Sequence, residues 1–190
     1  MNAKVKKSKA AIIQAGMELL VRNPDAPLSD IAQHAGVGRA TLYRLFASKE
    51  ELVKAISIHC YQAFDAATED LASQTHSALE MIRLLYQAVI PKNLELQFLE
   101  RLGDIGEDDS ELMAIRDQQF EDMLELVEYG KKTGEINPDL PSDWLVYVIE
   151  SLFYPVGMMQ DEPRPGSPHY SEAQLVDLAF KTVCQGIAKP

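Results

Sequence analysis

LSDIAQHAGVGRATLYRLF, the segment from residue 28 to residue 46, carries the clearest structural pattern in this chain. In its first part, apolar residues recur at the three- and four-residue spacing of a helix that buries one face, at Leu28, Ile31, Ala32 and Ala35. Gly36-Val37-Gly38 interrupts that pattern, and Gly36 can adopt the positive φ of a tight turn. A second short helix is then predicted over residues 39–46. Two short helices joined by such a turn form a helix-turn-helix.

The second helix of this pair has an inward and an outward face. Leu42, Leu45 and Phe46 are predicted to point into the core. The opposite face is basic and aromatic, and its residues lie three or four positions apart: Arg39, Ala40, Tyr43 and Arg44. Such a face fits the ~12 Å major groove of DNA. The alternative is that the two helices are ordinary parts of a helical bundle.

We therefore predict that the chain binds double-stranded DNA through six residues, Arg39, Ala40, Thr41, Tyr43, Arg44 and Lys49. Arg39, at the start of the helix, is the candidate for bidentate recognition of guanine. Thr41 is expected at a base methyl group or a phosphate, and Tyr43 and Arg44 are expected at phosphates. Lys49, beside the N-terminus of the next helix, is a further candidate phosphate contact.

The rest of the chain has helical patterns as well, which together predict an all-α protein of about nine helices. One helix is expected over residues 9–21, before the helix-turn-helix. After it, Ser48 and Glu51 form a capping box at the start of a long helix that reaches residue 73, and a second capping box begins at Ser77. Further helices are predicted over residues 77–90, 93–102, 110–133, 142–159 and 171–187, with Gly134 as a C-cap and Pro155 as a kink or an early end.

Net charge is −11, but the two ends of the chain differ in sign. Residues 1–54 hold nine Lys and Arg against five Asp and Glu, and residues 55–190 hold nine against 24. Positive charge confined to one end is typical of a nucleic-acid-binding module fused to another domain. The lysines at positions 4, 6, 7 and 9 are expected to form a flexible arm, which either follows DNA or is a solvated terminus. No apolar run reaches the ~20 residues of a membrane span, so we expect a cytoplasmic protein with no membrane partner.

A family resemblance is carried by Ile31-Ala32, Ala35-Gly36-Val37, Thr41-Leu42-Tyr43, Phe46, Ser48-Lys49-Glu50 and Leu52. These residues and their spacing resemble the signature of the tetracycline-repressor (TetR) family, and the match covers residues 9–54. The resemblance implies a DNA-binding domain over residues 1–50 and a helical effector-binding and dimerisation domain over residues 51–190. It also implies a homodimer, usually a repressor, that binds a near-palindromic operator and leaves it when a small molecule binds. Pro27 and Gly38 depart from the family's pattern, which often has a capping Ser or Thr at each position.

The helices expected over residues 142–159 and 171–187 are apolar around more of their circumference than a surface helix requires. We predict that they form a four-helix bundle with the same helices of a second subunit; the alternative is that they pack within one subunit. The expected dimer contacts are Leu145, Val148, Leu152, Leu175, Leu178, Ala179 and Val183. Glu150, a polar residue within this apolar segment, is expected either on the surface or at a bound cation.

The resemblance further implies an effector cavity in the second domain. Its candidate lining residues are Met81, Leu85, Phe120, Leu124, Trp144 and Tyr147. Met and aromatic side chains at helical spacing are also the ordinary content of a core, and this alternative stays open. From composition, the unidentified small-molecule effector is expected to be apolar or amphipathic.

No motif in the chain indicates catalysis. The four His and two Cys have no metal-ligand spacing, and there is no Gly-rich phosphate loop or nucleophile motif. We therefore expect no enzyme activity, no cofactor and no metal. Cys60 and Cys184 are expected to be buried, reduced thiols, with a redox switch as the alternative. The remaining functional alternative is a helical small-molecule-binding or protein-interaction module whose helix-turn-helix is non-functional.

Overall fold

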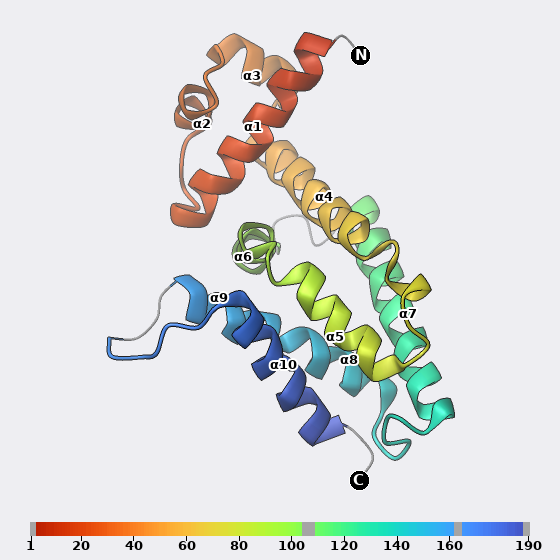
Figure 1. Ribbon diagram of the computed structural model, residues 1–190. Helices are drawn as coiled ribbons and strands as arrows, with labels where there is room; N and C mark the ends of the chain where they lie inside the picture. The colour runs from red at the N-terminus through yellow and green to blue at the C-terminus, as the bar shows by residue number, and fades with distance from the viewer. Residues whose placement is uncertain (1–2, 104–108, 162–164, 188–190) are drawn as a thin grey trace. The chain divides into compact units, whose positions relative to one another are not determined.

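The structure is a computed structural model that describes residues 3–103, 109–161 and 165–187 (Figure 1). These residues form ten α-helices and one short 3-10 helix, and they contain no β-strand. The all-α prediction is confirmed. Within the described residues, no helix combines the length and apolar character needed to cross a membrane.

Contacts along the chain divide it into two compact units. Unit 1 consists of Met1–Ala63 and Leu94–Met113, and unit 2 of Phe64–Asn93 and Ala114–Pro190. Helices α4 (Lys49–Thr68) and α7 (Ser110–Thr133) each begin in unit 1 and end in unit 2. The domain boundary after residue 50 remains a prediction from the resemblance.

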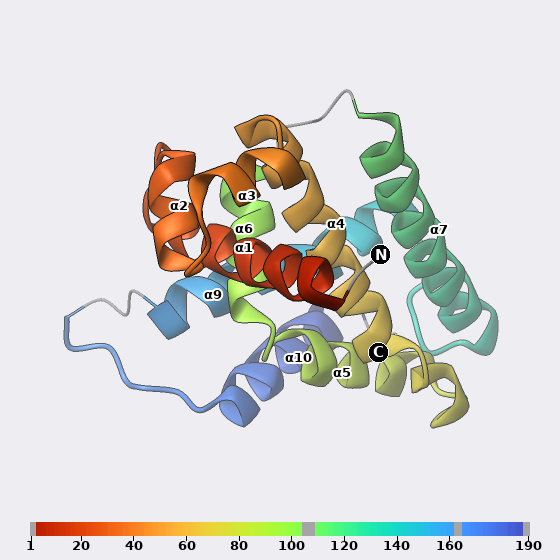
Figure 2. The same cartoon turned by 90° about the horizontal axis from the view of Figure 1, so that it is seen from above.

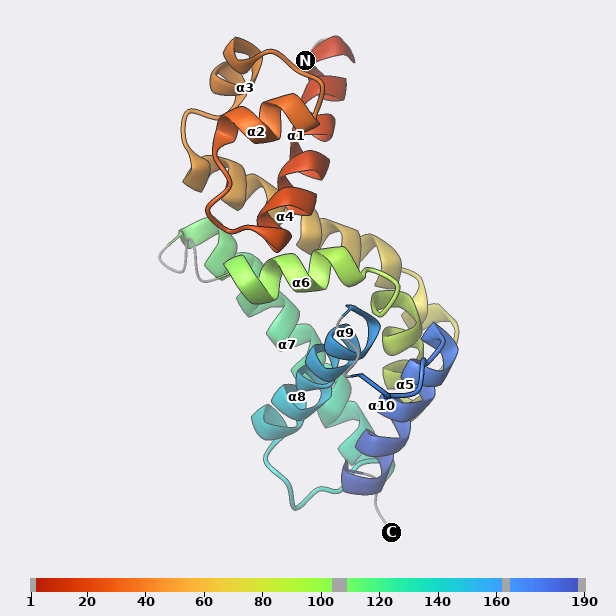
Figure 3. The ribbon, with the colours of Figure 1, turned by 90° about the vertical axis from the view of Figure 1, so that its left-hand side faces the viewer.

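Unit 1 contains α1 (Ala3–Arg22), α2 (Leu28–His34), α3 (Arg39–Leu45), most of α4 and nearly all of α6 (Asn93–Leu102). Figure 3 shows α1, α2 and α3 grouped around one another. Each helix of the unit contributes fully buried side chains to one core, among them Leu20, Ile31, Leu42, Ile56 and Phe98. The burial of these apolar side chains holds the short helices α2 and α3 in place, because helices of seven residues are not stable alone.

Helix α1 packs closely on α4. A Cβ atom added to Gly16 would lie 2.9 Å from Cδ1 of Ile56 and 3.4 Å from Cδ2 of Leu52. Only the first distance is clearly shorter than ordinary van der Waals contact, so a side chain at this position would displace the end of the Ile56 side chain. Glycine therefore lets the Ile56 side chain pack directly against the backbone of α1.

Unit 2 contains the end of α4, the 3-10 helix η1 (Leu71–Ser73), α5 (Ala78–Val89), most of α7, α8 (Ser142–Ser151), α9 (Phe153–Asp161) and α10 (Glu172–Ile187). Helix α10 lies alongside α5 (Figures 1 and 2). Tyr86, which has no exposed surface, lies in the centre of this core. Its hydroxyl donates a 2.8 Å hydrogen bond to the carbonyl of Ile149, and its ring meets Phe153 edge to face at 5.3 Å. A buried phenol thus keeps a hydrogen-bond partner, as buried polar groups require.

Two helix predictions need correction. The long helix expected to reach residue 73 ends at Thr68, whose hydroxyl donates hydrogen bonds to the carbonyls of Phe64 and Asp65, and η1 follows after a short turn. The single helix expected over residues 142–159 is two helices, α8 and α9, which meet at Leu152. Pro155 lies in the first turn of α9, where its missing N–H is tolerated; within a continuous helix it would have removed a hydrogen bond. The expected effect of Pro155 is thus confirmed.

The N-terminus of α5 has an unexpected cap. The Ser77 hydroxyl accepts a 3.2 Å hydrogen bond from the Glu80 N–H, as the capping box requires. The carboxylate that completes the cap comes from Glu135, after α7, and not from Glu80. It accepts hydrogen bonds from the N–H groups of Ala78 (3.0 Å) and Leu79 (3.3 Å) and from the Ser77 hydroxyl. Gly134, with φ +79°, ends α7 and turns the chain so that Glu135 reaches α5; its role as C-cap is confirmed.

Candidate nucleic-acid interface

The turn between α2 and α3 is a Schellman motif centred on Gly36. The N–H of Val37 donates to the carbonyl of Ala32 at 3.0 Å, and the N–H of Gly36 donates to that of Gln33 at 3.1 Å. Gly36 has φ +65°, a value that side-chain-bearing residues rarely adopt. Val37 packs against the core of unit 1. The sequence-based interpretation of Gly36-Val37-Gly38 as a tight inter-helix turn is confirmed in these details.

Helix α3 has the two faces that the sequence predicts. Leu42 is fully buried and Phe46, directly after the helix, is 3% exposed. On the other side, the exposed residues are Arg39, Ala40, Tyr43 and Arg44, with Thr41 half-buried between the faces. Tyr43 has 53% of its surface exposed, which is unusual for an aromatic side chain of a small helical unit. Helix α3 thus presents two guanidinium groups and a phenol to solvent from a rigid, well-packed support.

No side chain caps the N-terminus of either short helix. Pro27 precedes α2 and Gly38 precedes α3, and both have extended backbone with no side-chain hydrogen bond to the helix. A Cβ at Gly38 would meet nothing within 4 Å. These two departures from the TetR pattern therefore remove capping contacts without altering the path of the chain.

Lys49, the sixth predicted DNA contact, already has a role within unit 1. It is half-buried at the start of α4, and its ammonium donates a hydrogen bond to the carbonyl of Pro24, in the turn between α1 and α2. One half of the neighbouring capping box is present, because the Ser48 hydroxyl accepts from the Glu51 N–H at 3.2 Å. The Glu51 carboxylate accepts from the N–H of Ala47, one residue before the cap, at 2.7 Å. An ammonium has three donors, so Lys49 can hold the turn and still contact a phosphate.

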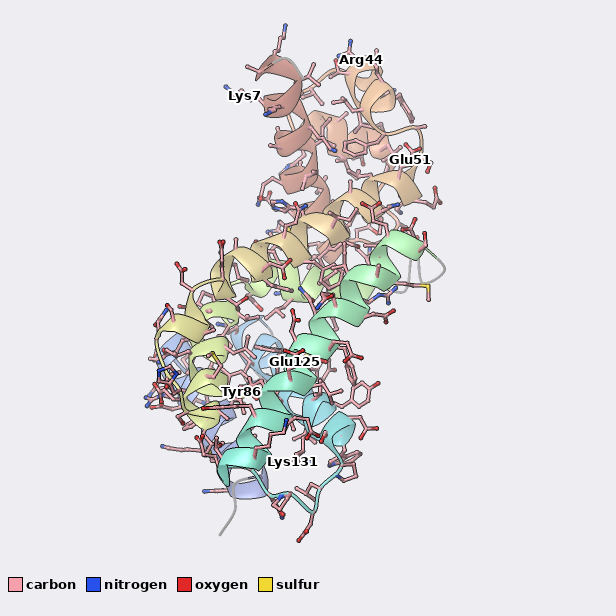
Figure 4. The ribbon with its side chains drawn as sticks, turned by 90° about the vertical axis from the view of Figure 1, so that its right-hand side faces the viewer. Lys7, Arg44, Glu51, Tyr86, Glu125 and Lys131 are labelled. Atoms are coloured by element: carbon pink, nitrogen blue, oxygen red, sulfur yellow. The ribbon has the colours of Figure 1, made fainter. Side chains whose placement is uncertain are left out.

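The N-terminal lysines do not form a flexible arm, which corrects the prediction. Helix α1 begins at Ala3, six residues earlier than expected, and carries all four lysines. Lys9 is half-buried, with its ammonium 5.9 Å from the centre of the Phe46 ring. Lys7 on α1 and Arg44 on α3 lie at the same end of unit 1 (Figure 4). The positive charge near α3 is therefore carried by a helix with fixed positions.

A polar contact joins α1 to α2 beside this face. Nε2 of His34 lies 2.9 Å from Oε2 of Glu18, and the amide of Gln14 donates to the other oxygen of Glu18 at 2.8 Å. The hydrogen bond from Gln14, together with that from His34, lowers the pKa of the Glu18 carboxyl. These contacts fix the outer side of the three-helix group.

The predicted effector-cavity residues do not line one common cavity in unit 2. Met81 and Leu85 line an open groove of about 860 Å³ between the end of α4, η1, α5 and α7. Phe120 and Leu124 are partly buried against the core, and the Phe120 ring lies 5.4 Å from that of Tyr147. Trp144 and Tyr147 are 60% and 61% exposed on α8. Only the first pair therefore lines the groove, and the sequence did not indicate its remaining lining.

The predicted dimer residues also separate. Leu145, Leu175, Ala179 and Val183 are at most 4% exposed and pack inside unit 2 of a single chain. Their side chains therefore offer no surface to a second copy, which corrects the prediction for these four residues. Val148 and Leu152 are half-buried, and Leu178 is 41% exposed. Glu150 is on the surface of α8, where surrounding protein partly desolvates its carboxyl and raises its pKa.

Large apolar side chains are instead exposed on the outer faces of α8, α9 and α10. They are Trp144, Tyr147, Tyr154, Met158, Met159 and Leu178. Trp144 and Tyr147 lie three positions apart on α8, and Tyr154 and Met158 lie four positions apart on α9. We name these six residues the outer aromatic face. An exposed group of this kind is uncommon on a monomer.

The two thiols differ in environment. Cys60 is fully buried, with its Sγ 3.7 Å from Sδ of Met17, and burial raises its pKa to about 12. Cys184 is half-buried, and burial raises its pKa too. Neither forms a disulfide. The described residues contain no group of His, Cys, Asp and Glu side chains that could hold a metal ion.

Comparisons with known proteins agree with this geometry. Residues 12–56 match the family described as bacterial regulatory proteins, tetR family. Over 95% of its length, the chain is 25% identical to the HTH-type transcriptional repressor LfrR of Mycolicibacterium smegmatis, of which it covers 90%.

Solved structures share the fold of the whole chain. The crystal structure of the TetR-like transcriptional regulator LfrR from Mycobacterium smegmatis in complex with proflavine matches all of both chains, with a TM-score of 0.74 and 24% identity. The ketosteroid transcriptional regulator KstR2 of Mycobacterium tuberculosis matches all of this chain and 97% of its own, with a TM-score of 0.78 and 21% identity. Residues 12–56, from within α1 to within α4, therefore match the tetR family model, and the whole chain is similar to a TetR-like repressor in sequence and to TetR-like regulators in fold.

Proposed function

We propose that the chain is a transcription repressor that binds a near-palindromic operator as a homodimer and leaves it when a small molecule binds unit 2. The observation that carries the proposal is the exposed face of α3. Arg39, Tyr43 and Arg44 project from a helix whose other side is anchored by the buried Leu42. Arginine forks at the start of a recognition helix read guanine edges in the major groove, and the remaining cationic and hydroxyl groups hold phosphates.

Recognition of an operator through α3 requires a homodimer. One seven-residue helix contacts too few base pairs to select a site, whereas two copies ~34 Å apart reach successive major grooves. The outer aromatic face is the surface that we assign to the dimer. It replaces the buried residues first predicted, because a side chain must be exposed in one chain in order to be covered by another. Leu178 of α10 belongs to both sets.

Effector control is supported by the groove in unit 2 and by the continuity of α4. The relative LfrR has been crystallised with proflavine, a small molecule. In this chain, α4 begins next to α3 with Lys49 and ends with residues that line the groove, Asp65 and Thr68. A ligand that moves the end of α4 would therefore act on the helix that adjoins the proposed DNA-binding helix α3. Such a role places the protein in the cytoplasm, with the DNA.

The test is selection of bound fragments from the source genome, followed by gel-shift titration at several salt concentrations. We expect a site with two related halves, bound by two chains, and an affinity that falls steeply as salt rises. Salt-insensitive binding, or no binding to any fragment, would contradict the proposal. That outcome would favour a helical small-molecule-binding or protein-interaction module with a non-functional helix-turn-helix.

A further inference from the structure

A carboxylate without a partner lies beside the outer aromatic face. Glu150 follows Tyr147 by three positions and is therefore on the same side of α8. Within the described residues, no ion pair or hydrogen bond involves its carboxylate. It lies in the last turn of α8, where the negative end of the helix dipole opposes a negative charge. An ionised Glu150 is thus poorly stabilised within one chain, and partial desolvation raises its pKa.

The other three carboxylates of α8 and α10 are better placed. Asp143 and Glu172 lie in the first turns of their helices, where the helix dipole favours negative charge. One oxygen of Asp177 lies 3.5 Å from the guanidinium of Arg83. Glu150 is therefore the carboxylate of these two helices that has neither a cation nor a favourable dipole beside it.

The helices that carry the outer aromatic face contain a single cation. Helices α8, α9 and α10 have no Arg or His and only one Lys, Lys181 of α10. Lys181 is exposed and follows Leu178, the α10 member of the outer aromatic face, by three positions. In the part of the chain that the structure describes, its ammonium takes part in no ion pair. Two opposite charges, both unpaired, thus neighbour the same apolar surface.

Symmetry decides what these two charges meet in a dimer. In a twofold-symmetric interface, each residue of one face lies opposite a residue of an identical face. Apolar side chains can meet copies of themselves, but two carboxylates brought together in a partly dehydrated interface repel each other. Glu150 therefore needs a cation from the second subunit, and the three helices supply only Lys181.

We propose that in the homodimer the Glu150 carboxylate of each subunit pairs with the Lys181 ammonium of the other, which gives two reciprocal ion pairs beside the apolar contacts. These pairs make the face selective for a second copy of this chain. A related chain with an uncharged or like-charged residue at either position would leave a partly desolvated charge unpaired. The inference rests on the proposed function, because it takes the outer aromatic face as the dimer interface.

The first experiment reverses the charges in the full-length protein. The dissociation constant of the dimer is measured by sedimentation velocity for Glu150→Lys, Lys181→Glu and the variant that combines them, and circular dichroism checks that each one folds. We expect each single reversal to weaken the dimer at least about tenfold, and the combined variant to lie within about threefold of the parent. Single reversals that dimerise like the parent, or a combined variant no better than either, overturn the proposal.

The net charge of −11 makes one of these variants diagnostic. Glu150→Lys makes the chain less negative, so net charge alone would favour association, whereas the ion pair predicts a weaker dimer. Glu121→Lys, at an exposed position of α7, is the control for the same change in charge and should not weaken the dimer. Equal weakening by Glu121→Lys and Glu150→Lys overturns the proposal.

The second experiment decides whether the pair joins two subunits or lies within one. Chains with Glu150→Lys and chains with Lys181→Glu are mixed in equal amounts, and the dimers are counted by native mass spectrometry. One chain then brings two cations to the two pairs and the other brings two carboxylates, so we expect mixed dimers to outnumber all others. A pair within one chain would stay disrupted in the mixture. A share of mixed dimers no greater than the statistical half overturns the proposal.

The parent protein and Tyr147→Glu separate failure of this inference from failure of the proposed function. A parent that is monomeric at every concentration contradicts the proposed dimer, and this inference with it. A parent dimer that Tyr147→Glu dissociates, but that is indifferent to the charge reversals, supports the proposed interface and overturns only the ion pairs.

Discussion

Nζ of Lys49, the first residue of α4, donates a hydrogen bond to the carbonyl oxygen of Pro24, in the turn between α1 and α2. This bond joins two segments that lie on either side of the helix-turn-helix in sequence. The ammonium that we expect at a DNA phosphate therefore also fixes the position of the turn. Its substitution should change both stability and affinity.

Lys49→Met should lower the free energy of unfolding by about 1–2 kcal/mol, because the Pro24 carbonyl loses a charged donor. It should also weaken binding to the operator and to random DNA by a similar factor, because a phosphate contact carries no sequence information. Urea denaturation and fluorescence anisotropy measure the two effects. Lys132→Met, at an exposed position of α7, is the control for loss of one positive charge. Unchanged stability would show that the bond to Pro24 contributes nothing in solution.

Arg39→Ala should weaken binding to the operator by about 1–3 kcal/mol and reduce its advantage over random DNA. Arg39→Lys keeps the charge but removes the planar fork, so it should also lose discrimination while retaining most of the affinity for random DNA. Arg44→Ala, in contrast, should weaken both kinds of DNA and reduce the salt slope by about 1. Competition titrations at three salt concentrations measure the affinity of each variant for the operator and for random DNA. If Arg39→Lys weakened binding to the operator and to random DNA equally, the base-specific contact would have to be assigned to another residue of α3.

The helix-turn-helix could be predicted from sequence because its signals are local. Gly36 is required by the backbone conformation of one turn, and the burial of Leu42 follows from spacing within one helix. The faces of α3 were thus predictable without knowledge of any long-range contact. At the beginning of α1 the local signal was misleading. Four lysines in the first turns resemble a disordered arm more than a helix, so the start of the helix was predicted wrongly.

The groove in unit 2 and the exposed residues of the outer aromatic face were not predictable in this way. Spacing places Asp122 and Glu125 on one side of α7, but nothing in the sequence says that the end of α4 lies opposite. Similarly, α8 is apolar on two sides, and periodicity alone does not say that Leu145 is buried while Trp144 is exposed. Glu135 illustrates the same limit, because its partner, the start of α5, lies 57 residues away in sequence. Each of these features depends on which helix packs against which.

Cys60 should be unreactive in the native protein. Its thiol is fully buried and its pKa is about 12, so at pH 8 almost none of it is the nucleophilic thiolate. Iodoacetamide should therefore label only Cys184 before unfolding, as measured by mass spectrometry, and Cys184→Ser should take up no label until denaturant is added. Rapid labelling of the Cys184→Ser variant would mean that the core of unit 1 opens. A disulfide formed under mild oxidation would revive the redox-switch alternative.

Trp144 reports on dimerisation because it is the only tryptophan of the chain and is 60% exposed. If the outer aromatic face is the dimer interface, its fluorescence should shift to shorter wavelength as the protein concentration rises. Tyr147→Glu should place a charge in the interface and yield monomers by light scattering, with an unchanged circular dichroism spectrum. Tyr43→Glu, at an exposed position of α3, is the matched control and should remain dimeric. A dimeric Tyr147→Glu variant would exclude this face.

Glu135 should make the stability of the protein depend on pH in the acid range. Burial opposes ionisation of its carboxyl, but hydrogen bonds from Ser77, from the N–H groups of Ala78 and Leu79 and from Thr133 outweigh this effect and lower its pKa below the usual 4.5. Because the folded state lowers the pKa, the stabilisation is fully present above pH 4.5 and is lost as the pH falls through the lowered value.

Glu135→Gln should therefore cost about 1 kcal/mol at pH 7, and the difference from the parent should shrink as the pH falls through the lowered pKa of Glu135. The matched control is Glu80→Gln, at the position where the capping box predicted the carboxylate. Since Glu135 occupies the cap in its place, Glu80→Gln should have a smaller effect at pH 7. Urea denaturation between pH 3 and pH 7, at steps of about 0.5, measures both variants. A larger loss in Glu80→Gln than in Glu135→Gln would restore the local capping box and contradict the long-range cap.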